Sequence, residues 1–235
     1  MNNKENIIWI ASFDLGKLNF AFYIEEIQLQ DFSSMKLISE NKKYNINGTP
    51  TLDFSHILEK VYSNGKNILL KNINLTNGVD SKKYFDLEYC YNMSDVLDEY
   101  SEYWDKVDFI IIEQQMSFGK KTNTMALKLA QHCASYFINK YGRCAKKIIE
   151  FPSYHKTHTL GAEKITKTTK NGKITYKNID AKERKKWAVE QAFYILSLRD
   201  DFETMSEISL MKKKDDVSDV IIQLQAYKCL YLYNK

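Results

Sequence analysis

The chain has 235 residues, of which 44% are hydrophobic and 13% aromatic, while only 2 are proline and 8 are glycine. This composition excludes a disordered chain, which would be poorer in large apolar residues, and a collagen-like or linker-rich chain, which would need far more glycine and proline. The 34 Lys and Arg residues and 30 Asp and Glu residues give a net charge of +4, which is too small to identify a nucleic-acid-binding protein by itself.

No segment of the sequence indicates secretion or membrane insertion. The first 14 residues contain an acid at the fifth position and lack the apolar core of about 7–15 residues that a signal peptide needs. No apolar run approaches the roughly 20 residues that span a bilayer. The cysteines are scattered without metal-like spacing, at Cys90, Cys133, Cys144 and Cys229. We therefore expect an intracellular protein with reduced cysteines and no membrane contact.

The first part of the chain predicts strands that end on functional groups. Residues 7–13 form a β-branched and aromatic run that ends at Asp14, and a second apolar stretch covers 20–27. The Asn- and Lys-rich stretch at 31–66 is interpreted as an insertion with weak structure. Alternating apolar residues predict a third strand at 67–75.

The remainder alternates helices with strands. A short apolar strand at 109–112 ends on Glu113, and another strand covers 147–151 before Pro152. A basic hairpin is predicted at 164–179 because Asn171-Gly172 is a strong two-residue turn signal. Helical periodicity predicts four helices, at 94–106, 124–141, 181–198 and 216–231. This order predicts an α/β fold with a mixed central sheet flanked by helices.

Four carboxylates stand out from this pattern. Asp14 and Glu113 each close an apolar strand, and Asp216 and Asp219 are three residues apart on one helix, so they share a face. Clustered carboxylates repel one another unless a cation compensates, and Mg²⁺ or Mn²⁺ is the usual partner of oxygen ligands. Two such ions can activate water and stabilise a leaving oxygen in phosphodiester cleavage. The alternative is that each strand-end acid only caps the next element and that the helical pair forms a solvated face.

Four blocks of this sequence resemble the signature blocks of RuvC-like Holliday-junction resolvases, most closely the poxvirus-type branch found in large DNA viruses. They occur in the family's order at residues 10–19, 111–115, 184–190 and 213–219. The resemblance implies an RNase H-like fold that forms one domain over residues 1–235, with insertions at about 31–66 and 164–179. It also implies a homodimer and metal-dependent cleavage of four-way DNA junctions.

The same resemblance assigns the catalytic and metal-binding residues. Asp14, Glu113, Asp216 and Asp219 match the family's carboxylates, which would hold two Mg²⁺ or Mn²⁺ ions. The family's catalytic lysine falls in the block at 184–186, where Lys186 is favoured and Lys185 is the alternative.

Further residues are candidates for contact with DNA, although each is also compatible with an ordinary turn, packing or surface role. Lys156, which follows the strand at 147–151, is a candidate second cation of the active site. The complete set of predicted DNA-binding residues is Lys17, Gln115, Lys120, Lys121, Lys156 and Arg184.

The modest net charge conceals two segments of opposite sign. Residues 79–113 hold 10 acids against 3 basic residues, whereas residues 141–190 hold 13 basic residues against 5 acids. The second segment contains the hairpin and the 184–186 block, which predicts a basic DNA-binding face beside an acidic metal site.

Two other functions fit the same residues. One is an RNase H-like nuclease that acts on RNA–DNA hybrids or flaps, and the other is a non-catalytic DNA-binding protein of the same fold. The resemblance and the Asn-, Lys-, Ile- and Tyr-rich composition suggest a viral protein, for which we expect the host cytoplasm or a viral replication site.

Overall fold

The computed structural model describes residues 6–80, 82, 85–115, 123–143, 145–169 and 171–234. Contacts divide the chain into two compact units. The first unit comprises Met1–Ile27 and Lys66–Ser153, and the second comprises Gln28–Gly65 and Tyr154–Lys235. The expected insertion at 31–66 therefore belongs almost entirely to the second unit. The assignment of the whole chain to one domain stays a prediction.

The first unit is built on a five-stranded mixed sheet in the order β3-β2-β1-β4-β5. Its strands are β1 (Ile7–Leu15), β2 (Phe20–Gln28), β3 (Lys66–Ile73), β4 (Phe109–Gln114) and β5 (Lys147–Pro152). β1, β4 and β5 run parallel, and β3 runs antiparallel to β2. Only four residues connect β1 to β2, which is too short for a parallel crossover, so β2 reverses direction. The five strands predicted from the sequence are confirmed.

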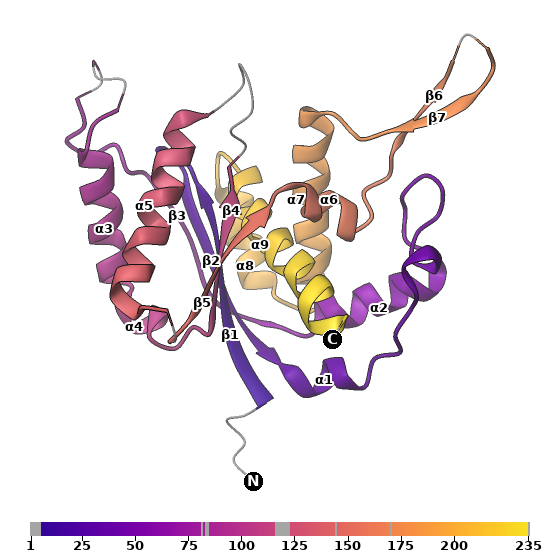
Figure 1. Ribbon diagram of the computed structural model, residues 1–235, viewed down its shortest axis with the longest axis horizontal. Coiled ribbons are helices and arrows are strands. Elements are labelled where there is room, and N and C mark those ends of the chain that lie inside the picture. The colour runs from indigo at the N-terminus through magenta and orange to yellow at the C-terminus, as the bar shows by residue number, and fades with distance from the viewer. Residues whose placement is uncertain are drawn as a thin grey trace. The chain divides into compact units, whose positions relative to one another are not determined.

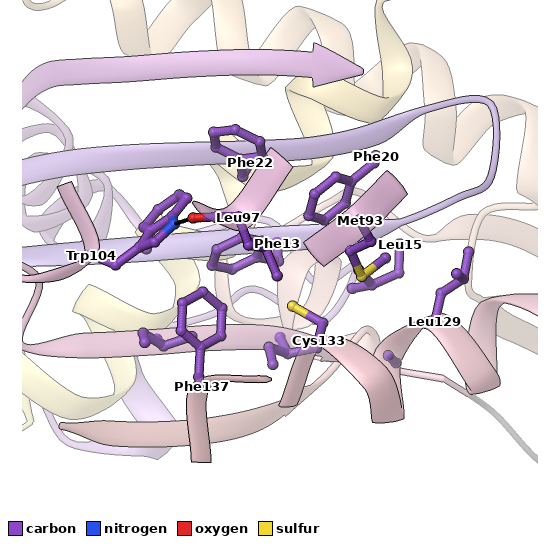
Figure 2. Packing of buried hydrophobic residues seen from close by; sticks show 14 of the residues in the cluster. Phe13, Leu15, Phe20, Phe22, Met93, Leu97, Trp104, Leu129, Cys133 and Phe137 are labelled. Atoms are coloured by element: carbon purple, nitrogen blue, oxygen red, sulfur yellow. Dashed lines mark hydrogen bonds between the residues drawn. The ribbon is translucent and has the colours of Figure 1, made fainter. Parts of the chain in front are cut away.

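Helices α3 (Glu88–Glu99), α4 (Ser101–Trp104) and α5 (Thr124–Tyr141) contribute to a core that lies on one face of this sheet. Figure 2 shows Phe13, Phe20 and Phe22 of the strands meeting side chains from these helices. The indole nitrogen of Trp104 is satisfied in this apolar setting because it donates to the Leu97 carbonyl at 2.7 Å. One buried face therefore anchors β1, which also carries Asp14.

Phe13 is the centre of the aromatic packing. Its ring centroid lies 5.4 Å from that of Trp104, 5.4 Å from that of Phe137 and 5.8 Å from that of Phe22. These separations fall in the range where aromatic pairs add to the free energy gained by burial.

The helix predicted at 94–106 begins earlier and is interrupted. α3 starts at Glu88, and the chain departs from helical geometry at Tyr100 before α4. Ser94 does not cap a helix; its hydroxyl is hydrogen-bonded to His132 Nε2 of α5 at 2.9 Å. Residue 94 therefore lies inside α3, and its side chain is used in a contact with a residue 38 positions later.

The second unit is mainly helical. Its long helices are α2 (Leu52–Ser63), α7 (Ala181–Ser197), α8 (Phe202–Leu210) and α9 (Asp215–Tyr227), with α9 followed by the π-helix η4 (Lys228–Tyr233). Its short helices are α1 (Leu29–Ser33), η2 (Glu40–Lys42) and α6 (Tyr154–Thr159). Both α6 and α7 pack against α9. From Val220 to Tyr227, α9 is buried at every residue, which fits a central helix.

The expectation of weak structure at 31–66 is wrong. The segment contains α2, and Phe54, Val61 and Tyr62 of this helix are buried. The Tyr233 hydroxyl of η4 accepts from the Ile38 amide at 2.9 Å and donates to the Lys36 carbonyl at 2.9 Å. Contacts with residues almost 200 positions later order this polar stretch.

The predicted basic hairpin is confirmed as β6 (Ile165–Thr168) and β7 (Ile174–Lys177), joined through Gly172 at a φ of 74°. In Figure 1 this hairpin extends from α7 as a two-stranded ribbon. Every residue of the two strands is exposed, so no core of the second unit holds the ribbon in place.

Within the described ranges, no helix is long and apolar enough to cross a membrane. Cys90, Cys133 and Cys229 are free thiols, as expected, and burial raises the pKa of Cys229 to about 12. Cys144 lies outside the described residues.

We predict that Phe13→Ala lowers the free energy of unfolding by about 3–5 kcal/mol, because it removes a fully buried ring and leaves a cavity. Urea denaturation of the full chain, followed by circular dichroism, measures the change. Ile138→Ala on α5 is the control, because Ile138 is exposed and its truncation is expected to change stability by less than about 0.5 kcal/mol. Equal effects of the two variants would contradict the central role of Phe13.

Candidate active site

Asp14 and Glu113 lie side by side at the ends of neighbouring parallel strands. Phe13 of β1 pairs with Ile112 of β4, so the next pair in this register is Asp14 and Glu113. Side chains alternate along a strand, which places both carboxylates on the face opposite the core cluster that contains Phe13 and Ile112. Both residues are half-buried. The structure therefore brings this predicted pair together.

The turn after β1 is closed by a glycine. A Cβ at Gly16 would lie 2.9 Å from the carbonyl oxygen of Asn19, which is closer than real Cβ contacts allow. Gly16 thus lets the chain reverse immediately after Asp14 and enter β2. Lys17 follows in this turn, is exposed, and places its Nζ 5.8 Å from the ring centroid of Tyr89.

The first turns of α9 carry three carboxylates, each ion-paired with a lysine from a different segment. Lys185 of α7 contacts Asp215, and Lys213 of the preceding loop contacts Asp216. Lys156 of α6 contacts Asp219. Acids in the first turn also suit the partial positive charge of a helix N-terminus. We call these six residues the lysine–carboxylate cluster.

Lys156 is the most buried cation of the cluster. Its side chain is only 6% exposed, and its Nζ lies 3.2 Å from Asp219 Oδ1. α6 packs against α9, which brings Lys156 next to Asp219. A buried ammonium must be compensated by acceptors in the protein, and the Asp219 carboxylate is one such acceptor for Lys156.

The Asp215–Lys185 pair is held in its charged form. Burial is the largest single influence and raises the pKa of Asp215, but the hydrogen bond from Lys185 and the positive charges of Lys185 and Lys213 together outweigh it, so the net pKa is lowered. The same hydrogen bond raises the pKa of Lys185. Both shifts favour an ammonium next to a carboxylate at neutral pH.

Lys186 occupies a different position from Lys185. It is 71% exposed and lies 3.6 Å from Glu190, four residues further along α7. Of the two lysines considered for the catalytic role, the alternative Lys185 is the one that contacts the α9 carboxylates. The catalytic assignment itself stays a prediction.

The predicted metal ligands are distributed as two pairs, Asp14 and Glu113 in the first unit and Asp216 and Asp219 in the second. Across the part of the chain that the structure describes, no three His, Cys, Asp or Glu side chains form a group that could hold a metal ion. The four-carboxylate metal site therefore stays a prediction.

One observation fits a hard cation near Asp216. Its Oδ2 atom is buried and accepts no hydrogen bond, although Lys213 Nζ lies 2.7 Å away. A buried carboxylate oxygen that is paired electrostatically with an ammonium but accepts no hydrogen bond is a suitable ligand for Mg²⁺ or Mn²⁺, which prefer carboxylate oxygens.

The other predicted DNA contacts are only partly described. Arg184 is exposed on α7, and Gln115 is half-buried with its Nε2 donating to the Glu113 carbonyl at 3.4 Å. Lys120 and Lys121 lie outside the described residues. Sequence reasoning missed Lys213 as part of the site, although its spacing of three from Asp216 in the Lys212-Lys213-Lys214-Asp215-Asp216 run allows such a pair.

The strand order and directions of the first unit define an RNase H-like α/β protein, which is the fold implied by the four sequence blocks. No family model matches the chain. The chain is 37% identical to the uncharacterized protein 170L of Invertebrate iridescent virus 6, over 97% of this chain and 92% of that protein, and it belongs to the same family. It is also 26% identical to the uncharacterized protein 97L of Invertebrate iridescent virus 3, over 93% of this chain and 98% of that protein.

Solved structures similar to the chain include resolvases. The fowlpox virus Holliday junction resolvase matches with a TM-score of 0.45 and 12% identity, over 94% of this chain and 97% of that chain. Thermus thermophilus RuvC matches with a TM-score of 0.49 and 8% identity, over 94% and 95% of the two chains.

We predict that Lys156 and Asp219 are energetically coupled in the metal-free protein. A double-mutant cycle with Lys156→Met and Asp219→Asn, measured by urea denaturation in EDTA, is expected to give a coupling free energy of about 1–3 kcal/mol, because the ammonium is buried against its partner.

The matched control is the cycle of Lys186→Met with Glu190→Gln, an exposed pair for which we expect less than about 0.5 kcal/mol. A Lys156–Asp219 coupling no larger than that of the control would show that this pair does not hold the site together.

Proposed function

We propose that the protein is a metal-dependent endonuclease that resolves four-way DNA junctions. The observation that carries this proposal is the register of β1 and β4, which places Asp14 and Glu113 together on one face at the ends of two strands of an RNase H-like sheet. The Asp216 and Asp219 pair on α9 supplies the second half of the carboxylate set. The order of the four sequence blocks supports the same class of enzyme.

Asp14, Glu113, Asp216 and Asp219 would hold Mg²⁺ or Mn²⁺, two ions in each active site. When bound, such ions lower the pKa of a water nucleophile and stabilise the leaving oxygen of a phosphodiester. The contribution of the chain is to position four carboxylates. Rigid strands and a buried helix are suited to this task, because small displacements of catalytic groups lower the rate steeply.

Lys156 and Lys185 would act on the phosphate. Each ammonium lies next to an α9 carboxylate, where it can offset negative charge that develops on the scissile phosphate. Lys156 is held by burial, so its charge would be placed before the substrate binds. Lys185 is more exposed and can move toward DNA.

The β6–β7 hairpin and the start of α7 would bind the DNA backbone. Residues 164–179 contain five lysines and no acid. A two-stranded ribbon fits the major groove of B-DNA, which is about 12 Å wide. In the observed register, Lys167 and Lys177 lie on the same face of the ribbon, which presents both charges to one surface. This arrangement would bind DNA without strong sequence preference.

Resolution of a junction requires two nicks, so the proposal includes a homodimer. A two-fold axis that relates two copies of the chain would match the approximate two-fold symmetry of a four-way junction. The expected products are two duplexes with nicks in opposed strands. Intracellular action at a viral replication site is the location that fits this function.

We predict that the protein cleaves a four-way junction in the presence of Mg²⁺ or Mn²⁺ and that Asp216→Asn lowers the rate by more than about 100-fold. Loss of a partner of a metal ligand already costs about 10- to 100-fold, and Asp216 is proposed as a ligand itself. Cleavage of labelled four-way junction, Y-fork, RNA–DNA hybrid and linear duplex is compared on gels, with junction binding measured in parallel.

The control variant is Asp95→Asn, which changes an exposed aspartate of α3 that has the same spacing of three to a second aspartate, Asp98. This variant is expected to cleave normally. Cleavage of the hybrid but not of the junction would establish the RNase H-like alternative, and junction binding without cleavage in either metal would indicate a non-catalytic DNA-binding protein.

We also predict that Lys167→Gln combined with Lys177→Gln weakens junction binding and lowers the slope of log affinity against log salt by about 2, because each phosphate contact contributes about 1. Fluorescence anisotropy between 50 and 200 mM salt measures both quantities. Deletion of residues 164–179 should weaken binding at least as much.

Lys36→Gln combined with Lys60→Gln removes the same charge from exposed positions that are not part of the hairpin and should leave the slope unchanged. If both double variants behave alike, the hairpin contributes only net charge and not a defined contact.

A further inference from the structure

Lys213 differs from the other two lysines of the lysine–carboxylate cluster. It lies in the loop immediately before α9, so no helix fixes its position. Its Nζ approaches both oxygens of one carboxylate, at 2.9 Å from Asp216 Oδ1 and 2.7 Å from Asp216 Oδ2. The lysine side chain is 47% exposed, whereas the aspartate side chain is 14% exposed. A solvent-accessible cation thus covers a carboxylate that is itself largely buried.

Lys213 and a divalent cation compete for the same atoms. An ammonium and a metal ion both take carboxylate oxygens, and Asp216 offers only two. A metal ion that binds Asp216 must therefore displace the ammonium from at least one oxygen. Breaking this ion pair costs free energy, and this cost lowers the apparent affinity of the DNA-free protein for the metal ion.

The displaced ammonium can be used by DNA. Lys213 is flanked by Lys212 and Lys214, so the loop presents three successive positive charges. A phosphate that contacts Lys213 draws it away from Asp216 and makes the carboxylate available. Coupling between two ligands is reciprocal, so a metal ion that occupies Asp216 also makes Lys213 available to a phosphate.

We propose that the ion pair with Lys213 blocks Asp216 from a metal ion in the DNA-free protein and thereby couples metal binding to DNA binding. We call this ion pair the latch. This inference rests on the proposed metal-dependent nuclease function. Its consequence is that the DNA-free protein binds metal weakly and therefore has an incomplete active site until a phosphate backbone arrives. Lys213 acts as a positioning residue for Asp216, and its own contact with DNA follows release.

The test measures Mn²⁺ binding to the DNA-free full chain by isothermal titration calorimetry and by electron paramagnetic resonance of unbound Mn²⁺. Lys213→Met is expected to lower the dissociation constant about 5-fold relative to Lys212→Met, which corresponds to an opposing ion pair worth about 1 kcal/mol. Lys212→Met is the matched control because it removes one charge from the same exposed loop.

Lys213→Arg restores the positive charge and is expected to return the dissociation constant to the wild-type value. Urea denaturation of each variant checks that the fold is intact. Equal Mn²⁺ affinity of Lys213→Met and Lys212→Met would overturn the latch while leaving the nuclease proposal standing. Absence of Mn²⁺ binding by the wild type, Lys213→Met and Asp216→Asn proteins alike would overturn the metal-dependent function and the latch together.

Discussion

Repulsion between carboxylates at the start of α9 is the constraint around which the second unit is organised. Asp215, Asp216 and Asp219 lie within two turns of one helix, so their charges must be compensated locally. α6, α7 and the loop before α9 each supply a lysine to this point. At the start of α9, the packing of α6 and α7 against this helix is thus accompanied by ion pairs with its carboxylates.

In the first unit, the sheet holds two acids, Asp14 and Glu113, at fixed positions. The aromatic cluster around Phe13 buries one face of β1 and leaves the next residue, Asp14, on the other face. The parallel register with β4 then places Glu113 beside it. A shift of one residue in either strand would turn a carboxylate into the apolar core, so the core packing and the site depend on the same register.

Local patterns in the sequence were sufficient for the strands of both units and for the long helices α3, α5, α7 and α9, whereas α2, α6 and α8 of the second unit were not predicted. The five strands, the helix at 124–141 and the hairpin around Gly172 have strong local signals, and all are present. In the segment at 31–66, helix α2 was missed although its buried apolar residues recur at helical spacing, at Phe54, Ile57, Leu58, Val61 and Tyr62. Other parts of the second unit are ordered by distant partners. Lys228, for example, is fully buried and donates to the Asn64 carbonyl and to Gln225 Oε1, contacts that no local pattern reveals.

The sequence by itself determined which chemical groups are present and in what order: acids that close two apolar strands, a pair of acids on the last helix, and a basic segment between them. Only the tertiary structure decided which lysine forms an ion pair with which acid. Lys185 and Lys186 are adjacent and chemically identical, but a helix turns by about 100° per residue, so one contacts Asp215 while the other pairs with Glu190. Lys156 acquires its role in the same way, because burial beside Asp219 depends on how α6 packs on α9, and packing is a property of distant parts of the chain.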